Sequence, residues 1–266
     1  MLVTAPENYA QRFSEALKAV SLKNGQRFEP IVLPLIETEL KTDDGLLDDF
    51  LKNIATFDYV LFASRRAIDA VAEGLKRNSV KLPSQLGYIA IGKDGEYLEH
   101  VLGVKSCFVD GESSLMGVVR SLASDAKIAE KRIAVLTPKT EGMTEPSTVP
   151  DFLSALKQTN MEVVCVPVYL TRRAREAVLE RVATLLSVGL DLVALTSGAE
   201  AQVYQGVLKG KLFKNQAIKR PEVACFGPYT AKCAKESGLS VDFVSKEFHS
   251  FAAFSENLQR WKDEME

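Results

Sequence analysis

Five short loops of small and polar residues hold the groups in this sequence that are best suited to bind an anion. Each loop follows an apolar segment typical of a buried strand, and we expect each to lead into a helix. A helix start leaves backbone N–H groups unpaired and has a favourable dipole, which together stabilise an anion by about 0.3–1 kcal/mol at an exposed site. Five such loops around one cleft would suit a polyanionic ligand. The loops are Ser64-Arg65-Arg66, Gly92-Lys93-Asp94-Gly95, Thr137-Pro138-Lys139-Thr140, Thr196-Ser197-Gly198 and Gly227-Pro228-Tyr229-Thr230.

Any one of these loops has a simpler explanation. Ser, Thr and Gly are common helix caps, and every α/β protein needs several of them. The interpretation as a ligand site therefore depends on the repetition of the pattern and not on a single loop.

Common cofactor and nucleophile motifs are not found in the sequence. Gly92 to Gly95 gives only GxxG, and GVLKGKL at 206–212 lacks the spacing and the Ser or Thr of a phosphate-binding P-loop. No GxSxG elbow occurs, and Ser64 and Ser197 have no evident histidine base. The sequence therefore predicts a protein without a nucleotide cofactor and disfavours acyl transfer.

Composition limits the remaining classes of protein. The 266 residues are 46% apolar, enough for two ordinary cores, and 33 basic residues balance 35 acidic ones, which argues against a nucleic-acid partner. Two histidines largely exclude a multi-histidine metal site, so we predict no metal. Four cysteines without a CxxC pair are typical of reduced thiols, and no apolar run reaches the roughly 18 residues of a membrane span. We therefore expect no membrane partner and a reducing compartment.

The elements that must position the loops alternate regularly between strand and helix. Short apolar runs are separated by stretches with apolar residues at helical spacing, a pattern that predicts parallel sheets covered by helices on both faces, the α/β class. The expected strands are 2–5, 59–63, 88–91, 106–109, 132–136, 192–195, 222–226 and 241–244, and the expected helices are 9–20, 66–76, 115–124, 150–158, 175–187, 200–208 and 251–261.

An internal repeat with a period of about 133 residues organises the chain. FDYVLFASRRAIDAV (57–71) aligns with LDLVALTSGAEAQVY (190–204), so that Ser64 matches Ser197. The segment 88–109 aligns with 223–244, and IAVLTP (133–138) resembles MLVTAP (1–6). We therefore expect two similar parallel-sheet lobes that arose by duplication.

Two extended segments occupy equivalent places in the two halves, and each contains a proline, Pro34 or Pro167. Proline lacks an N–H donor, which predicts edge-like connecting strands. We expect 35–41 and 162–170 to pair as a two-stranded linker. One domain would then comprise 1–34 and 171–266, the other would comprise 42–161, and a hinged cleft would lie between them.

Several motifs together resemble the uroporphyrinogen-III synthase family. VLFASRRAIDAV is similar to the family's strand–Ser–x–Arg–Ala segment, LVALTSGAEA to its Ser-Gly segment, and ACFGPYTAKCAKESGL to its Gly-Pro-x-Thr-Ala segment. VPVYLT resembles its Tyr-x-Thr linker. The opening LVTAPENYAQRF and the stretch LTPKTEGMTEPSTVPDFL are most similar to the cyanobacterial and plastid branch. The matches span both halves of the chain in the family's order.

The resemblance implies an enzyme, a cyclising lyase that needs no cofactor. Its substrate would be hydroxymethylbilane, a linear tetrapyrrole of haem and chlorophyll biosynthesis that carries acetate and propionate groups. The hydroxymethyl hydroxyl would leave to give an azafulvene cation. The substituted carbon of the terminal ring would then attack, and a spiro intermediate would lead to uroporphyrinogen III with that ring inverted.

The resemblance also implies roles for individual residues. Tyr169 matches the family's tyrosine proposed to assist departure of the hydroxyl; its alternative role is that of an aromatic anchor for the linker. Family members are thought to hold the product chiefly through backbone amides. The residues expected to bind substrate are Ser64, Arg66, Gly92, Lys93, Thr137, Lys139, Ser197, Gly198, Gly227, Tyr229 and Thr230.

One alternative function belongs to a different class of protein. Hinged α/β lobes with a polar cleft also occur in non-enzymatic proteins that bind or sense small anions. The first expected strand begins at Leu2 and leaves no room for a secretion signal, which argues against an exported binder. We expect a monomer in the cytoplasm, or in the plastid stroma if a transit peptide has been removed, with possible transient contact with the preceding pathway enzyme.

Overall fold

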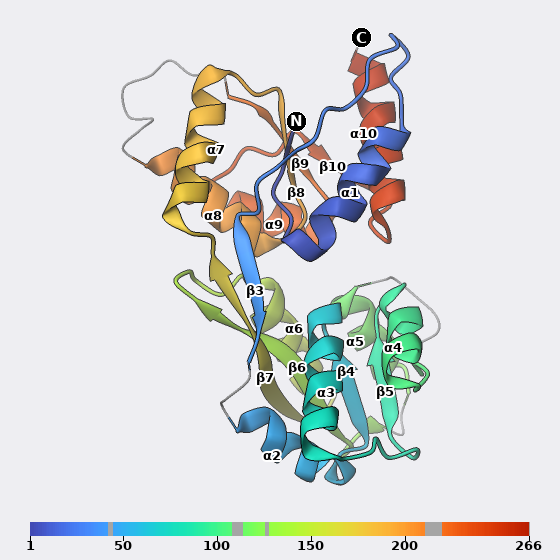
Figure 1. Cartoon of the computed structure of the whole chain (residues 1–266). Helices are drawn as coiled ribbons and strands as arrows, with labels where there is room; N and C mark the ends of the chain where they lie inside the picture. Colours follow the sequence, from blue (N-terminus) through green and yellow to red (C-terminus); the bar gives the residue numbers. More distant parts are fainter. Residues whose placement is uncertain (42–44, 108–113, 126–127, 211–219, 266) are drawn as a thin grey trace. The chain divides into compact units, whose positions relative to one another are not determined.

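The computed structural model describes residues 1–41, 45–107, 114–125, 128–210 and 220–265. The chain divides into two compact units. Unit 1 comprises Met1–Glu37, Glu141–Thr148 and Arg172–Glu266, and unit 2 comprises Thr38–Thr140 and Val149–Thr171. Both units are α/β, as the sequence predicts (Figure 1). Within the described residues, no helix is both long and apolar enough to cross a membrane.

Unit 1 contains a five-stranded sheet in the order β10-β9-β8-β1-β2. The strand pairs β1–β2, β1–β8, β8–β9 and β9–β10 are all parallel. Parallel pairing at every step places the carboxyl ends of the five strands at one edge of the sheet. The strands are β1 (Leu2–Val3), β2 (Ile31–Val32), β8 (Leu192–Leu195), β9 (Glu222–Cys225) and β10 (Phe243–Val244).

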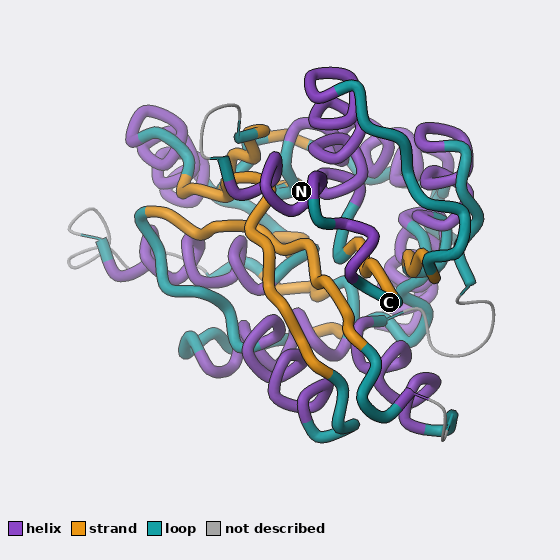
Figure 2. Tube along the Cα trace, turned by 90° about the horizontal axis from the view of Figure 1, so that it is seen from below, coloured by secondary structure: helices purple, strands orange, loops and turns teal. Residues whose placement is uncertain are grey.

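Helices cover both faces of this sheet because its strands are apolar on both sides (Figure 2). Helices α7 (Glu176–Val188), α8 (Gly198–Lys209) and α9 (Pro228–Glu236) pack on one face, where Val193 and Leu195 point. Helices α1 (Glu7–Ala19) and α10 (Phe251–Met265) pack on the face that holds Leu192 and Ala194. There the ring of Phe13 stacks on those of Phe251 and Phe254, with centroids 5.0 and 5.2 Å away.

The second sheet has the order β3-β7-β6-β4-β5. Strand β4 lies parallel to both β5 and β6. The strands are β3 (Ile36–Leu40), β4 (Tyr59–Phe62), β5 (Gly87–Ala90), β6 (Arg132–Glu141) and β7 (Glu162–Arg173).

Helices also pack on both faces of this second sheet. Helices α2 (Leu46–Lys52), α3 (Arg65–Asn78) and α4 (Asp94–Leu102) contact the face of Val60 and Phe62, and a 3-10 turn (Ile54–Thr56) follows α2. Helices α5 (Leu115–Ala123) and α6 (Thr148–Lys157) contact the face of Leu61.

Matching the strands by the sequence repeat gives the two sheets the same order. β2, β1, β8 and β9 in one sheet correspond to β7, β6, β4 and β5 in the other. The counterpart of β10 is a single parallel bridge between Tyr88 and Ser106, and residues 108 and 109 of the expected strand lie outside the described residues. Gene duplication as the origin of this correspondence stays a prediction.

The expectation that both proline segments are edge-like strands is wrong for one of them. Pro167 lies inside β7, which is flanked by β3 and β6. Pro34 lies between β2 and β3 and belongs to neither strand. β3 is the edge strand of its sheet and is hydrogen-bonded to β7. An interior strand therefore contains a proline, whose missing N–H removes one ladder donor.

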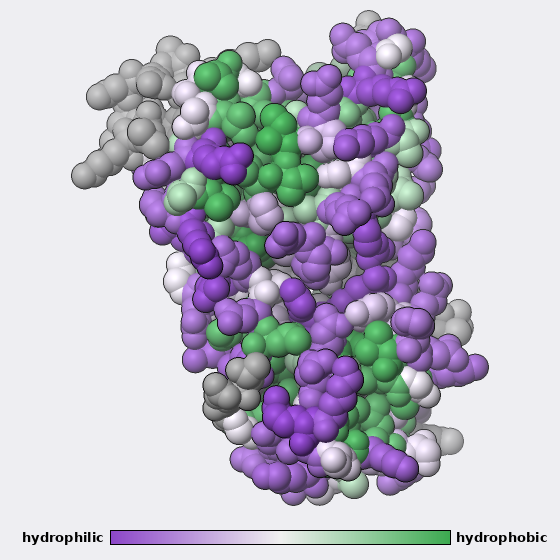
Figure 3. Space-filling model, viewed as in Figure 1, coloured by the Kyte–Doolittle hydropathy of each residue, from purple (hydrophilic) through white to green (hydrophobic). Residues whose placement is uncertain are grey.

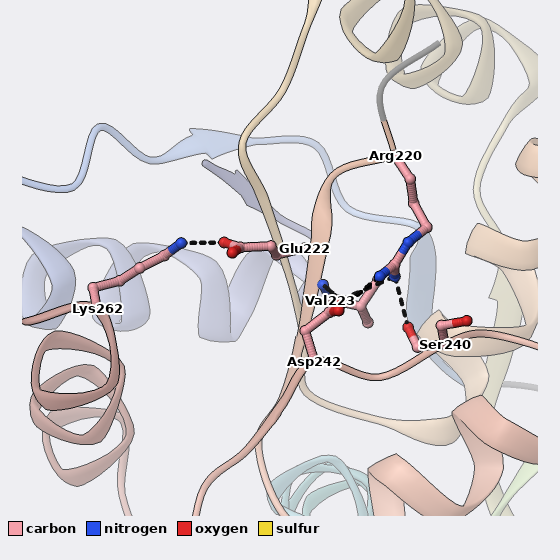
Figure 4. A network of polar contacts seen from close by, with 6 residues as sticks. All are labelled: Arg220, Glu222, Val223, Ser240, Asp242 and Lys262. Carbon is pink, nitrogen blue, oxygen red and sulfur yellow. Dashed lines mark hydrogen bonds and ion pairs between the residues drawn. The ribbon is translucent and has the colours of Figure 1, made fainter. Parts of the chain in front are cut away.

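Polar side chains hold the amino ends of β9 and β10 together (Figure 4). The carboxylate of Asp242 accepts a 2.7 Å hydrogen bond from the Val223 N–H and two from the Arg220 guanidinium, at 2.9 and 2.6 Å. Arg220 also donates to the Ser240 carbonyl at 3.1 Å, and Lys262 pairs with Glu222. The network lies at the amino ends of these strands, opposite to the loops at their carboxyl ends.

Strand β2, at one edge of the unit 1 sheet, has two partly exposed apolar side chains. Ile31 and Val32 of β2 are each 39% exposed. Figure 3 shows that unit 1 has apolar residues gathered on the side turned to the viewer. The short length of β2, only two residues, limits the exposed backbone edge that another strand could pair with.

Candidate functional site

The predicted site residues fall into one group in each unit. Ser64, Arg66, Gly92, Lys93, Thr137, Lys139 and Tyr169 belong to unit 2, whereas Ser197, Gly198, Gly227, Tyr229 and Thr230 belong to unit 1. Within each unit the loops lie where parallel strands end, the usual position of ligand sites in open α/β sheets. The cleft expected between the two groups stays a prediction.

The central contact in unit 2 joins Ser64 to Tyr169. Ser64 caps helix α3: its hydroxyl oxygen accepts a hydrogen bond from the Ala67 N–H at 3.4 Å. The same hydroxyl donates to the phenolic oxygen of Tyr169 at 2.9 Å. Tyr169 lies in β7 and is only 7% exposed. Two candidate residues that are 105 positions apart in the sequence are therefore joined by a hydrogen bond.

Burial raises the pKa of the Tyr169 phenol, while the hydrogen bond from Ser64 and the nearby charge of Arg66 act in the opposite direction. The phenol is therefore neutral at neutral pH and keeps its hydrogen. Because its oxygen accepts from Ser64, that hydrogen remains for donation to another acceptor.

Arginines beside this pair interact with residues of their own unit. The Arg65 guanidinium donates to Asp94 at 2.7 Å and lies over the Tyr97 ring, 4.8 Å from its centroid. Arg66 donates to the Thr38 hydroxyl at 3.0 Å. These side chains are about a quarter exposed, so each arginine retains some access to solvent.

Helix α4 begins at the end of β5. Gly92 has a φ of +53°, a left-handed conformation that suits glycine, and Lys93 is the residue before the helix. Both residues are exposed. No side chain caps this helix, and the carbonyl of Lys93 accepts a 3.5 Å contact from Arg65.

The expectation that Thr137 to Thr140 form a loop leading into a helix is wrong. Strand β6 continues through these residues to Glu141, and helix α6 begins only at Thr148. Thr137 is buried, with its hydroxyl oxygen 3.3 Å from the Cys165 sulfur. Lys139 lies further along the strand and is exposed. Helix starts therefore follow four of the five predicted loops.

In unit 1 the loop after β8 surrounds a buried carboxyl group. Ser197 caps helix α8 by accepting a hydrogen bond from the Glu200 N–H at 3.3 Å. Glu200 is 0% exposed. One of its oxygens, Oε1, accepts from the hydroxyls of Thr196 and Ser197 at 2.6 and 2.9 Å. The other, Oε2, accepts from the Thr196 N–H at 2.8 Å and lies 2.6 Å from the hydroxyl oxygen of Thr4 at the end of β1.

The two glycines predicted in unit 1 make room for other parts of the same unit. A Cβ atom at Gly198 would lie 2.7 Å from the Cys233 sulfur and 3.0 Å from Pro146. A Cβ atom at Gly227 would lie 2.8 Å from the Phe248 ring. A side chain at either position would therefore force neighbouring side chains to shift, which explains glycine there without a ligand.

The loop after β9 contacts the loop after β8. Thr230 is buried and donates from its hydroxyl to the Thr196 carbonyl at 3.2 Å. Tyr229 packs edge-on against Phe248, with ring centroids 6.3 Å apart. Ser197, Gly198, Gly227, Tyr229 and Thr230 therefore lie in two adjoining loops.

Sequence reasoning missed Glu200 and Thr4. A signal for Glu200 was present, because Ser197-Gly198-Ala199-Glu200 has the Ser-x-x-Glu spacing of a capping box. Here the glutamate accepts from the N–H of Thr196 in place of the usual N–H of the cap residue. No short-range pattern could have connected Thr4 to a residue 196 positions away.

A cavity of about 820 Å³ opens elsewhere in unit 1, lined by residues of α7, α8 and α9 and by 142–144. It includes none of the predicted site residues, so we do not assign the candidate site to it. Among the described residues, no group of three or more His, Cys, Asp and Glu side chains is placed to hold a metal ion.

Two five-stranded α/β units with polar loops at their strand ends define a two-domain α/β protein with loops suited to anionic groups. The chain belongs to the uroporphyrinogen-III synthase HemD family, whose model matches residues 15–255. Members of this family are cyclising lyases of tetrapyrrole biosynthesis. No curated protein sequence matches the chain.

Solved structures confirm the predicted fold. A mutant uroporphyrinogen III synthase of Thermus thermophilus matches with a TM-score of 0.59 and 17% identity, over 97% of this chain and 98% of that one. Uroporphyrinogen-III synthetase of Helicobacter pylori matches with a TM-score of 0.53 and 16% identity, over 89% and 95%. Nothing in these comparisons supports the alternative of a non-enzymatic anion binder.

Proposed function

We propose that this chain cyclises hydroxymethylbilane to uroporphyrinogen III and that Tyr169, supported by Ser64, assists loss of the hydroxyl group. Family membership supports the reaction. The observation that carries the residue assignment is the 2.9 Å hydrogen bond from Ser64 to the Tyr169 oxygen at the carboxyl end of β4. It leaves the phenolic hydrogen to be donated to a substrate oxygen.

Tyr169 acts in this proposal as a hydrogen-bond donor that keeps its proton in the free enzyme. A phenol is a weak acid at neutral pH, and burial raises its pKa further. As its O–H approaches the departing hydroxyl, negative charge grows on the phenolic oxygen. The hydrogen bond from Ser64 points at that oxygen and stabilises the growing charge.

The steps that follow need positioning more than further acid–base groups. The C–O bond breaks and the hydroxyl leaves as water after taking up a proton. The substituted carbon of the terminal ring attacks the resulting azafulvene cation, and the spiro intermediate opens and recloses with the ring inverted. The final loss of a proton from carbon restores the one consumed. The enzyme's task is to select the attacking carbon.

Substrate carboxylates would be held by helix starts and hydroxyls. The loops that begin α3, α4, α8 and α9 supply backbone N–H groups at positive dipole ends. Ser64, Gly92, Lys93, Ser197, Gly198, Gly227, Tyr229 and Thr230 belong to these loops, and Arg66, Thr137 and Lys139 complete the proposed binding set. Because Arg65 is paired with Asp94, the amides carry much of the anion binding in this proposal.

An isomer assay tests the reaction. Purified protein is given freshly made hydroxymethylbilane without added metal or nucleotide, and the type I and type III products are separated. We expect mainly type III, because spontaneous closure gives type I. Exclusive formation of type I would overturn the proposal.

A matched pair of variants tests the role of Tyr169. Tyr169→Phe should lower kcat/KM by roughly 10- to 100-fold and raise the type I fraction, because slow turnover lets spontaneous closure compete. Tyr88→Phe is the control: this buried tyrosine of the same unit donates to the Pro83 carbonyl at 2.7 Å. Equal activities for the two variants would mean that the Tyr169 hydroxyl does not assist the reaction and that the residue serves as an aromatic anchor for the linker.

Location and partners follow from the same proposal. The substrate is a small tetrapyrrole, and we expect the enzyme to act as a monomer, with transient contact with the enzyme that supplies its unstable substrate. The four cysteines are free thiols, which supports a reducing compartment such as the cytoplasm or the plastid stroma. Membership of the cyanobacterial and plastid branch, with a place in chlorophyll synthesis, stays a prediction.

A further inference from the structure

Glu200 is a buried acidic group beside loops proposed to bind a polyanion. Its carboxyl group lies in the first turn of α8 and is closed off from solvent. It touches the end of β1 through Thr4 and the end of β8 through Thr196 and Ser197. A fixed negative charge here would oppose binding of substrate carboxylates, so the protonation state of Glu200 matters for function.

The hydrogen bonds of Thr4 determine that state. The Thr4 hydroxyl oxygen lies 2.7 Å from the Ala194 carbonyl oxygen and 2.6 Å from Glu200 Oε2. A hydroxyl carries one hydrogen, and a carbonyl oxygen can only accept. If Glu200 were ionised, Thr4 could satisfy only one of these oxygens, and the other would face it at hydrogen-bonding distance without a hydrogen between them.

A proton on Glu200 Oε2 resolves the conflict. Oε2 then donates to Thr4, and Thr4 donates to the Ala194 carbonyl. Oε2 can still accept from the Thr196 N–H, and Oε1 accepts from the hydroxyls of Thr196 and Ser197. Every hydrogen in the cluster has one acceptor in this arrangement.

We propose that Glu200 is held as a neutral carboxylic acid and acts as a positioning residue that fixes the Thr196–Ser197 loop without placing a negative charge beside the substrate. This inference rests on the proposed function of that loop. The acid fastens three separate segments: the end of β1, the end of β8 and the start of α8. This role requires the shape of the Glu200 side chain and its hydrogen bonds, but no negative charge.

The surroundings of the carboxyl group agree with a neutral acid. Burial raises the pKa of Glu200, and this effect exceeds the lowering effect of the hydrogen bonds from Thr196, Thr4 and Ser197. The thiol of Cys225, on the neighbouring strand β9, adds no charge to these surroundings. Burial raises the pKa of that thiol to about 12, so it is uncharged at neutral pH.

The unit 2 repeat provides an internal comparison. Ser64 caps α3 as Ser197 caps α8, and the residue that donates to Ser64 is Ala67. The position equivalent to Glu200 thus carries no acid. In unit 2 the cap hydroxyl donates to Tyr169 instead of to a carboxyl group. The hydroxyl of the cap residue is therefore held by a phenol in unit 2 and by a carboxyl group in unit 1.

Infrared spectroscopy measures the protonation state directly. At pH 7 the difference spectrum between wild type and Glu200→Gln should contain the C=O stretching band of a carboxylic acid. Glu256→Gln, at an exposed position on α10, is the matched control and should remove only carboxylate bands. Carboxylate bands for Glu200 would overturn the proposal. If Glu200→Gln fails to fold, isotope labelling of the glutamate carboxyl groups in wild-type protein must reveal a protonated glutamate at pH 7, and its absence would equally overturn the proposal.

Kinetics separate positioning from simple structural support. Glu200→Gln keeps a neutral group that can donate to Thr4 and accept from the two hydroxyls, but its nitrogen cannot accept from the Thr196 N–H. It should therefore raise KM by less than Glu200→Ala, which should raise KM by roughly tenfold with kcat little changed. A larger rise in KM for folded Glu200→Gln than for folded Glu200→Ala would contradict the positioning role of a neutral group. Failure of wild type to form type III product would instead contradict the proposed function and leave the spectroscopic result intact.

Discussion

Ser64 donates its hydroxyl hydrogen to the phenolic oxygen of Tyr169 across 2.9 Å while the same Ser64 oxygen caps helix α3. The helix start and the tyrosine of β7 are therefore joined by one hydroxyl group. Because both lone pairs and the hydrogen of a hydroxyl can be used at once, neither contact excludes the other. The effect of substituting one of these residues on kcat/KM should therefore depend on whether the other is present.

A double-mutant cycle measures this coupling. Ser64→Ala alone should lower kcat/KM through loss of support for Tyr169, and Tyr169→Phe alone should lower it further. The double variant should be little worse than Tyr169→Phe, which gives a coupling energy of about 1 kcal/mol. Strictly additive losses with intact folding would show that Ser64 acts independently of the phenol.

Binding that is shared among loops predicts modest effects of single hydroxyl deletions. Ser64→Ala, Ser197→Ala and Thr230→Val should each cost about 0.5–1.5 kcal/mol in transition-state stabilisation, or roughly 2- to 13-fold in kcat/KM. Thermal melts check that each variant is folded. A loss of several thousandfold in any folded variant would refute shared backbone binding.

The alternation of strand and helix predicted the fold because the sheets are mostly parallel and are buried on both faces. Val193 and Leu192, for example, point to opposite faces, and both are covered by helices. The sequence did not predict that Pro167 lies in an interior strand or that β6 extends through Thr140, because such features depend on neighbouring strands. Helix α2 was not among the helices expected from apolar spacing, because its seven residues span only about two turns.

Removing the Tyr204 hydroxyl should stabilise the protein. This side chain is fully buried, and its oxygen has no hydrogen-bond partner among the described residues. A buried polar group without a partner is costly, so Tyr204→Phe should raise the free energy of unfolding by about 1 kcal/mol. Urea unfolding measures the change. Tyr88→Phe, which breaks a bond to Pro83, should lose a similar amount; destabilisation of both variants would mean that Tyr204 has a partner.

Asp242 should make stability depend on pH in the acid range. Burial acts to raise its pKa, but the hydrogen bonds from Arg220 and the Val223 N–H prevail, and the pKa is lowered from its ordinary 3.8. A lowered pKa means that the native state binds fewer protons than the unfolded state there. The stabilisation is therefore present above about pH 4 and is lost as the pH falls through the native-state pKa.

A substitution isolates this contribution. Asp242→Asn should reduce the free energy of unfolding at pH 7 by about 1–2 kcal/mol and flatten its decline in acid, because Arg220 loses its charged partner. Asp49→Asn is the control, since this 74% exposed carboxylate forms a surface pair with Lys52 and should change little. Identical acid profiles for wild type and Asp242→Asn would contradict the assignment.

The candidate site was predictable only in part. Helix-start loops can be found from local patterns, so Ser64 and Ser197 were identified at helix starts by residue type and position. The contact of Ser64 with Tyr169 and that of Thr4 with Glu200 join residues more than 100 positions apart. Local spacing carries no information about such pairs, and only the resemblance to a family pointed to Tyr169.

The pairing of Leu2 with Val193 has a consequence for how the protein folds during synthesis. The first strand of unit 1 leaves the ribosome long before its partner β8 exists, whereas all five strands of the unit 2 sheet are complete once β7 has emerged at Arg173. Domains fold as their segments become available, and distant pairings are slow. We expect unit 2 to fold first, with Leu2 and Val3 held as an unpaired apolar end that needs protection until the last third of the chain has been made.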